Sequence, residues 1–411
     1  MASAAATRVD QVLPLQGVRI VDFGWVYAAP IATRSLADMG AEVIKIENKN
    51  HLDELRTSPS NVSRDIEKDP VFHDINRNKL SFAVDFARPE GAELIKRLVA
   101  VSDVVVENYS PGVLAKRGLD YPDLRAVRPD IIMLAMSAAG QTGPLHRIRT
   151  YGPSISALSG LDSMVGYPGE RVLGSQGFYP DMVGAIHGVI SVLAALWHRD
   201  RTGRGQYIDL SQWEATVGML GDAILDYTMN GVVRGTQGNR NAGASPHGNY
   251  PCGGEDTWVA IAVSDEDAWQ GFRRALGDPD WTREPWAADA YQRVANAATV
   301  DRHVAEWTRE RTPEEASEAL QREGVPAGPS LHVGERYFHP HFSERGFHVD
   351  LEHPATGVDI VGGIPWKFDG TPGQIRRPAP LYGEHTDYVL GELLEIPAEE
   401  RAGLRADEVV G

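Results

Sequence analysis

The chain has 411 residues, of which 42% are hydrophobic and 24% charged, and its formal net charge is −17. This length allows two or three domains, and the composition is that of an ordinary globular protein. The acidic balance argues against a nucleic-acid partner, because binding phosphates requires a basic face. No apolar run approaches the roughly 20 residues that span a bilayer, so no membrane partner is expected.

The N-terminus and the single cysteine indicate a cytoplasmic protein. Residues 1–14 lack the basic start and apolar stretch of a signal peptide, and we interpret them as a disordered lead-in. Cys252 is the only cysteine, which excludes intramolecular disulfides and a cysteine-rich metal site. His339 and His341 have no cluster of carboxylates or cysteines beside them, so no metal site is expected.

Strand and helix patterns alternate along the first half of the chain. Strands are predicted over residues 18–23, 42–47, 80–86, 103–107, 131–136 and 206–210. Helices are predicted over residues 30–36, 89–101, 111–116, 181–198 and 213–229. Strands separated by helices pair in parallel through right-handed crossovers. The sequence therefore predicts an α/β fold with an open, mostly parallel, Rossmann-like sheet in a large domain over residues 15–230.

The second half indicates a smaller α/β domain. Residues 231–335 begin with a linker rich in Gly and Asn, followed by a strand at 258–263 and helices at 265–276, 300–309 and 312–322. Thr312, followed by Pro313 and by Glu315 three residues on, is a typical helix start. Residues 336–411 form a third, C-terminal segment that is rich in Pro and Gly.

Asp181 stands at the start of the long apolar helix predicted over residues 181–198. Free backbone N–H groups and the positive end of the helix dipole favour negative charge at that place. We therefore expect the pKa of Asp181 to fall, which leaves an ionised carboxylate able to act as a nucleophile. Asp is also a preferred N-cap residue, so a purely structural capping role is the competing interpretation.

Lysine and arginine residues gather in three short stretches of this acidic chain. A few cations at one pocket suffice for a phosphorylated ligand, although solvated surface charge is the commoner role. The three pairs are Lys45 and Lys49, Arg77 and Lys79, and Lys116 and Arg117.

Several nucleotide-binding and hydrolytic motifs are missing. Gly24 opens the turn after the first strand, but that turn does not continue as GxGxxG, so a nicotinamide site is unsupported. The sequence also lacks GxxxxGK[ST], HExxH and GxSxG. The commonest nucleotide, zinc-protease and serine-hydrolase chemistries therefore have no support.

Six stretches together resemble the class III coenzyme A transferases of the CaiB/BaiF type, the family that includes formyl-CoA transferase and carnitine CoA-transferase. The resemblance is dense over residues 15–215 and looser beyond. The stretches are LQGVRIVDF at 15–23, LADMGAEVIKIE at 36–47, NRNKLS at 76–81, VVENYSPGVL at 105–114, GQTGP at 140–144 and RTGRGQYID at 201–209.

The resemblance implies a C-terminal segment that returns to the large domain, and two ring-like chains interlocked as a homodimer. The family's catalytic aspartate falls on Asp181, and its mobile glycine loop falls near Asn241 to Ser245, where this chain has a shorter loop with fewer glycines. The positions that match the family's CoA pocket are Val26, Tyr27, Ala28, Asn48, Val84, Ala87, Asn108, Tyr109, Lys116, Ser137 and Ala139.

The resemblance also implies a reaction. The Asp181 carboxylate attacks an acyl-CoA thioester, and the CoA thiolate then converts the aspartyl–acyl anhydride into an aspartyl-CoA thioester. An acceptor carboxylate and the same CoA reverse these steps. The expected partners are a carboxylic acid and a donor such as succinyl-CoA or acetyl-CoA, with no cofactor beyond CoA itself. Lys116 is expected to hold a CoA phosphate.

A few side chains limit which carboxylic acid can be the substrate. Tyr27 stands where formyl-CoA transferase has Gln, and Ala139 where it has an aromatic residue, which argues against formate and oxalate. Aromatic residues at Trp25, Phe178 and Tyr179 favour a larger acid.

Two alternative functions stay open. A 2-methylacyl-CoA racemase shares the fold and uses a His-Asp pair, but this chain has Tyr151 and Gly152 at those positions, and His146 is a poor substitute base. The second alternative is a non-catalytic CoA-binding subunit of a hetero-oligomer, since some relatives consist of two different chains.

Overall fold

The computed structural model describes residues 12–58 and 61–411, so most of the lead-in predicted for residues 1–14 lies outside the described residues. The chain forms two compact units. Unit 1 comprises the described residues up to 162 together with 175–232 and 343–411, and unit 2 comprises 163–174 and 233–342. Residues 163–174, which the sequence analysis assigned to the large domain, therefore cluster with the second unit.

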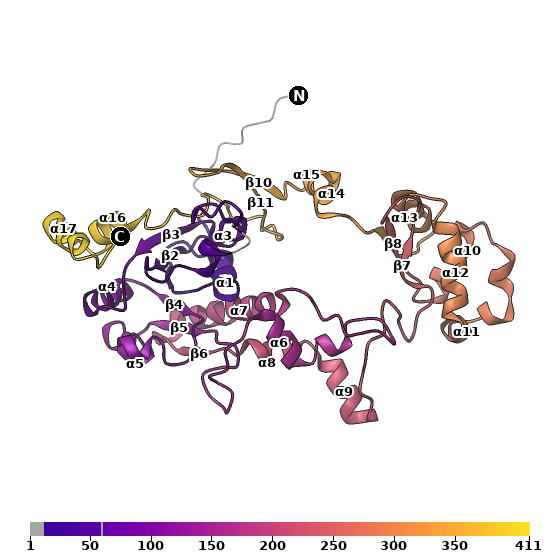
Figure 1. The fold of residues 1–411 in the computed structure, drawn as a ribbon, viewed down its shortest axis with the longest axis horizontal. Helices are drawn as coiled ribbons and strands as arrows, with labels where there is room; N and C mark the ends of the chain where they lie inside the picture. The colour runs from indigo at the N-terminus through magenta and orange to yellow at the C-terminus, as the bar shows by residue number, and fades with distance from the viewer. Residues whose placement is uncertain (1–11, 59–60) are drawn as a thin grey trace. The chain divides into compact units, whose positions relative to one another are not determined.

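Unit 1 is built on a six-stranded sheet in the order β3-β2-β1-β4-β5-β6, with every pair parallel (Figure 1). The predicted open parallel sheet is confirmed. The order reverses between β1 and β4, and in such sheets ligands bind beyond the carboxyl ends of the strands at this switch point. The strands are β1 (Arg19–Asp22), β2 (Glu42–Glu47), β3 (Lys79–Ala83), β4 (Val104–Glu107), β5 (Ile132–Ala135) and β6 (Tyr207–Asp209).

Helices cover both faces of this sheet because the central strands are apolar on both sides. Val21 and Val105 belong to one hydrophobic cluster, and their neighbours Ile20 and Val104 belong to the other. The first cluster includes residues of α4 (Pro89–Ala100) and α5 (Tyr121–Val127). The second includes residues of α1 (Ala28–Asp38), α3 (Pro70–Asn76) and α7 (Tyr179–Thr202).

The remaining helices of unit 1 are short. Those next to the carboxyl edge of the sheet matter most below. They are α2 (Glu54–Thr57), α6 (Gly152–Ser159), α8 (Gln212–Gly218) and α9 (Gly221–Asn230).

The C-terminal segment packs against the rest of unit 1. It contains the antiparallel hairpin β10 (His348–His353) and β11 (Gly357–Gly362), followed by α16 (Thr386–Tyr388) and α17 (Ala398–Ala406). Val389 and Leu390 are fully buried in the same cluster as α4. The backbone N–H of Gly411 donates to the carbonyl of Ala83 at 3.1 Å, so the end of the chain lies beside β3.

Helix α7 is long and apolar enough to cross a membrane by length and composition alone, contrary to the expectation that no run approaches that length. One such helix is weak evidence, because core helices pass the same test. Its residues Ala185, Val192 and Leu196 pack into the sheet's second cluster, and arginines occupy its last turn. This is the pattern of a core helix.

Unit 2 has an antiparallel sheet in the order β7-β8-β9, formed by His247–Pro251, Trp258–Ala262 and Ala327–Pro329. Trp269 and Phe272 form the centre of its core. The capping box predicted at Thr312 is present. The helices of this unit are α10 (Glu266–Ala275), α11 (Ala290–Ala295), α12 (Ala297–Thr308), α13 (Pro313–Arg322) and α14 (Val333–Phe338), and α15 (Pro340–Glu344) lies at the boundary with unit 1.

Two predicted elements of unit 1 are wrong in detail. The helix expected over 111–116 is a turn followed by a 3₁₀ turn at Ala115–Arg117. The helix expected over 213–229 divides into α8 and α9, with the break just before Gly221. Glycines at 218 and 221 lower helix propensity at the break.

Candidate active site

A cavity of about 270 Å³ lies at the carboxyl ends of β1, β4 and β5. Its wall is formed by the loops that follow these strands and by the N-terminal ends of four helices, α2, α6, α7 and α8. The lining residues are 25–27, Glu54, 108–111, 137–138, 148–152, Ile155, Phe178, Asp181 and Gln212. This is the position that the reversal of strand order between β1 and β4 predicts for a ligand.

Asp181 is the third residue of α7, and Phe178 occupies the N-cap position. The capping interpretation is therefore wrong, since no side chain caps this helix. The expected fall of the Asp181 pKa is also wrong. Burial raises the pKa of Asp181 to about 6, and the opposing effect of the backbone N–H groups of Asp181 and Ala28 is smaller. The carboxylate is 9% exposed, so loss of water outweighs the helix end.

Gly152 fits directly against the Asp181 side chain. A Cβ at residue 152 would lie 2.2 Å from the Oδ2 of Asp181, closer than any real contact allows. Gly152 is the first residue of α6, and its lack of a side chain leaves room for the Asp181 carboxylate. In the racemases this position holds the aspartate of the His-Asp pair. In this chain the glycine leaves room for the carboxylate of Asp181.

Aromatic rings form one side of the cavity. The rings of Tyr27 and Phe178 stack with their centroids 4.0 Å apart and their planes 19° from parallel. Trp25 meets Tyr109 edge to face at 5.7 Å. Of the aromatic residues expected near the acyl site, Trp25, Tyr27 and Phe178 line the cavity that holds Asp181, whereas Tyr179 does not.

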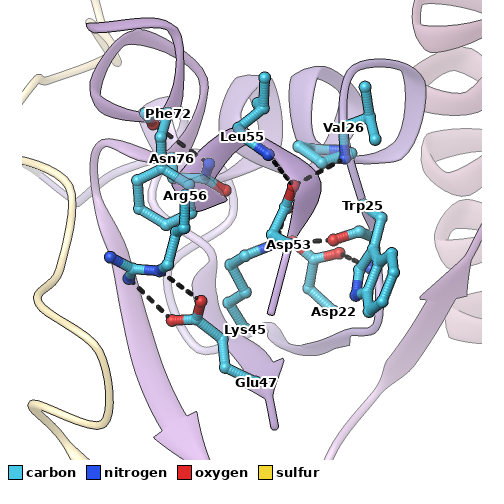
Figure 2. A network of polar contacts seen from close by, with 12 residues as sticks. Asp22, Trp25, Val26, Lys45, Glu47, Asp53, Leu55, Arg56, Phe72 and Asn76 are labelled. Atoms are coloured by element: carbon cyan, nitrogen blue, oxygen red, sulfur yellow. Dashed lines mark hydrogen bonds and ion pairs between the residues drawn. The ribbon is translucent and has the colours of Figure 1, made fainter. Parts of the chain in front are cut away.

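The loop that carries Val26 has an unusual backbone held by a buried ion pair (Figure 2). Val26 has φ of +61°, a left-handed conformation that β-branched residues rarely adopt. Its N–H donates to Oδ1 of Asp53 at 3.2 Å, and the other oxygen of Asp53 accepts from Lys45 at 2.9 Å. Lys45 also donates to the carbonyl of Gly24 at 2.6 Å. The hydrogen bonds from Asp53 and Lys45 thus hold the strained turn in place. A strained backbone at a binding loop persists only with such support from its surroundings.

Half of the clustered cations belong to the core. Lys45 pairs with Asp53 and Lys79 with Asp22 at 2.9 Å, with all four side chains 1% exposed or less. Burial lowers the pKa of Lys79 to about 8. Arg77 bonds Asp38. These three cations hold unit 1 together and do not reach a ligand, whereas Lys49, Lys116 and Arg117 are exposed.

Four buried polar atoms on cavity-lining residues have no hydrogen-bond partner among the described residues. They are the Oδ2 of Asp181, the hydroxyls of Tyr109 and Ser137, and the Oε1 of Gln212. Buried polar atoms are normally paired, so an accumulation around one cavity indicates a ligand site. Gln212 was not predicted from the sequence, because a lone Gln after a strand has no motif; only its burial and its place in the wall identify it.

The predicted CoA positions fall into two groups. Five of them line the cavity with Asp181, namely Val26, Tyr27, Asn108, Tyr109 and Ser137. Ala28 adjoins it through its backbone N–H, which acts on Asp181. The others do not line it, and the CoA-binding role of all these positions remains a prediction. Those outside the cavity wall are Asn48, Val84, Ala87, Lys116 and Ala139.

Two of the outlying positions have local roles. The side-chain amide of Asn48 donates to Oδ1 of Asp85 at 2.7 Å, and Ala87 is exposed. The loop Asn241 to Ser245 belongs to unit 2, and its role as a lid also remains a prediction.

Residues 15–386 match the family model described as CoA-transferase family III. The chain belongs to CoA-transferase family III. It is therefore a CoA-transferase, and the match covers unit 1, unit 2 and most of the C-terminal segment.

Relatives and a solved structure agree with this assignment. The chain is 33% identical over 406 residues to the succinyl-CoA–L-malate CoA-transferase alpha subunit of Chloroflexus aurantiacus, covering 97% of this chain and 93% of that protein. It is 33% identical over 386 residues to the succinate–glutarate CoA-transferase of Agrobacterium fabrum, covering 92% and 96%. The crystal structure of a CAIB/BAIF family protein from Brucella suis matches with a TM-score of 0.85 and 30% identity, covering 93% of this chain and all of that one.

Proposed function

We propose that this enzyme transfers CoA between dicarboxylic acids through covalent intermediates on Asp181. An Asp181 oxygen attacks the thioester carbonyl of an acyl-CoA, forming an aspartyl–acyl anhydride as the C–S bond breaks and CoA leaves as a thiolate. The thiolate attacks the aspartyl carbonyl and releases the donor acid. An acceptor carboxylate then attacks the aspartyl-CoA thioester, and the returning thiolate takes the acyl group of the new anhydride, which regenerates Asp181.

The observation that supports this mechanism is the buried carboxylate of Asp181 in the wall of the cavity. Its pKa of about 6 leaves it ionised at neutral pH, and little water competes for it. A desolvated carboxylate is a stronger nucleophile than a hydrated one, because attack requires no removal of its own water. The backbone N–H groups of Asp181 and Ala28 act on this carboxylate and are available to stabilise developing oxyanions.

Arg149 supports dicarboxylic acids as the substrates. It is the only Lys or Arg among the described residues of the cavity wall, and it has no carboxylate partner in the described part of the chain. Once one carboxylate of a diacid reacts at Asp181, its second carboxylate needs a cation, and a planar guanidinium suits it. The relatives named for succinate, malate and glutarate agree with this choice, and succinyl-CoA is the donor we propose.

Racemisation is less well supported. The Tyr151 hydroxyl donates to the carboxylate of Glu54 at 3.0 Å, and Gly152 packs on Asp181. No histidine is found among the described residues of the cavity wall, so the histidine of the racemases' His-Asp pair has no counterpart there.

We propose that the enzyme is cytoplasmic and assembles as a homodimer. The outer face of α7 supports assembly, because its exposed apolar side chains repeat along one side of the helix. They are Met182, Ile186, Ile190, Leu193 and Trp197, each 41–63% exposed. Such a stripe is typical of a protein interface. The alternative is a hetero-oligomer, as the name of the alpha subunit relative implies for that protein. Assaying this chain purified alone separates the two.

The decisive experiment looks for the covalent intermediate. The enzyme is incubated with succinyl-CoA, trapped with hydroxylamine or borohydride, digested and sequenced by mass spectrometry. We expect a modified Asp181 in the peptide that opens α7. Undiminished transfer by an Asp181→Ala variant would overturn the mechanism.

A further inference from the structure

Gln212 has an acceptor that nothing in the described structure satisfies. The residue opens α8 directly after Ser211, which caps the helix, and it is 6% exposed. Its Oε1 is buried and lacks a hydrogen-bond donor among the described residues, although the residue lines the cavity that holds Asp181. An acceptor left in this state destabilises the empty protein unless a ligand completes it.

The orientation of the Gln212 amide is fixed by its surroundings. Its Nε2 donates to the backbone carbonyl of Met136 at 2.9 Å. Because a carbonyl only accepts, turning the amide over would place two oxygens against each other. The oxygen of Gln212 is therefore the end of the amide that lacks a partner, and it can only accept.

Gln212 also has a fixed position relative to the nucleophile. A Cβ on Gly184 would lie 3.0 Å from the Cγ of Gln212, so the side chain packs against the bare backbone of α7. Gly184 is three residues after Asp181, and residues three apart share one face of a helix. Gln212 thus lies about one helical turn from the reacting carboxylate.

The chemistry of the ligands limits what can satisfy this oxygen. Carboxylates and thioester carbonyls only accept, as do Asp181 and Glu54 in the same wall. We infer that Gln212 is a positioning residue whose Oε1 accepts a hydrogen bond from a neutral donor on the substrate beside the reacting carbonyl. That donor is an N–H or O–H group, supplied by the amide nearest the sulfur of the CoA arm or by the hydroxyl of a hydroxy acid. The inference rests on the proposed transfer reaction.

Two matched pairs of substrates identify the donor. The first pair is the succinyl thioester of N-acetylcysteamine and that of 2-mercaptoethyl acetate, in which an ester oxygen replaces the amide N–H. The second pair is 2-hydroxyglutarate and glutarate as acceptors with succinyl-CoA. In the wild-type enzyme we expect one pair to differ by about 10- to 100-fold in kcat/KM, because the analogue without a donor leaves the buried oxygen unpaired.

The variants link this preference to Gln212. Gln212→Met, which has nearly the same length and no acceptor, is expected to remove the preference, whereas Gln206→Met at an exposed position keeps it. A preference in the first pair assigns the CoA arm, and one in the second assigns the acceptor hydroxyl. Equal rates within both pairs in the wild-type enzyme overturn the inference even if Gln212→Met does not fold, as does a preference that survives in this variant. If the wild-type enzyme transfers CoA from succinyl-CoA to none of the acceptor acids, the proposed function is overturned and the inference with it.

Discussion

Gly152 and Asp181 fit together so closely that the first residue of α6 has no room for a side chain beside the carboxylate that opens α7. A Cβ on Gly152 would come within 2.2 Å of Oδ2. Oδ2 has no hydrogen-bond partner among the described residues, so packing, including the contact with Gly152, limits where the oxygen lies. The position of the proposed nucleophile thus depends on a glycine 29 residues earlier in the chain.

We expect Gly152→Ala to reduce transfer by about 100-fold or more, because a misplacement of about 1 Å at the reacting group has that effect. The thermal midpoint should change little, because the atom that the added Cβ meets is the end of the Asp181 side chain, which can turn away, and because Ala is favourable in a helix. Gly218→Ala is the matched control, because a Cβ there meets nothing within 4 Å. Equal activity of the two variants would contradict the role assigned to Gly152.

The transfer rate should rise with pH and level off above pH 6. Asp181 attacks only when ionised, and burial raises the pKa of Asp181 to about 6. The measurement is kcat/KM for succinyl-CoA between pH 5 and 8. A profile that is flat across pH 6 would show that another step or group limits the reaction.

The same pKa predicts a gain in stability without Asp181. An acid whose pKa is raised on folding loses stability as the pH rises from its unfolded value, here 3.8, to its folded value of about 6. Asp181→Asn should therefore abolish transfer and stabilise the protein by about 1–3 kcal/mol at pH 7. Denaturant unfolding at pH 4 and pH 7 checks this, since the gain should nearly vanish at the lower pH.

The raised pKa of Glu107 predicts a second effect of pH on stability, and this effect does not involve Asp181. Burial raises the pKa of Glu107 at the end of β4 to about 8, and its Oε2 accepts the N–H of Tyr109 at 2.7 Å. Its contribution to stability is full below about pH 4.5 and is lost as the pH rises to about 8. Glu107→Gln keeps an acceptor and should raise the free energy of unfolding at pH 8 by at least about 1 kcal/mol. The exposed Glu93→Gln should not.

The pair formed by Lys45 and Asp53 should be essential for the fold. Asp53→Asn retains the side-chain shape but leaves the Lys45 ammonium without its ion-pair partner in a site that is 1% exposed or less. Breaking a buried pair from one side costs about 3–5 kcal/mol. Urea unfolding provides the measurement. Asp65→Asn, whose partner is the exposed Lys68, should leave the urea midpoint almost unchanged.

Arg149 should decide between acids with one and with two carboxylates. We expect Arg149→Gln to lower kcat/KM for glutarate by about 10-fold and to leave butyrate almost unchanged, because only glutarate brings a second charge to the guanidinium. The exposed Arg204→Gln serves as the control. Equal losses with both acids would assign Arg149 to a different part of the substrate.

The sequence correctly predicted the features that depend on residues close together in the chain. Alternating strands and helices were enough for the parallel sheet, because fully apolar strands such as residues 104–106 are stable only with both faces covered. The capping box at Thr312 was read correctly, since its two hydrogen bonds join residues three apart. The family resemblance supplied Asp181, which no local pattern distinguishes from an ordinary residue at a helix start.

The direction of the pKa shift of Asp181 could not be predicted from its neighbours. The helix end lowers its pKa, but burial raises it further, and that burial comes from segments far away in the sequence, such as Gly152. The clustered cations were misjudged for the same reason. Lys45 and Lys79 pair with Asp53 and Asp22, which only the folded sheet brings beside them.

The sequence by itself determined the class of fold, the order of its main elements and the family, because periodicity and short motifs depend on residues close together in the chain. Only the tertiary structure decided which carboxylate is desolvated, which lysines are buried and why Gln212 matters. Burial and pairing arise between residues distant in sequence, and the pKa of a group or the need of an oxygen for a donor exists only once those residues have met.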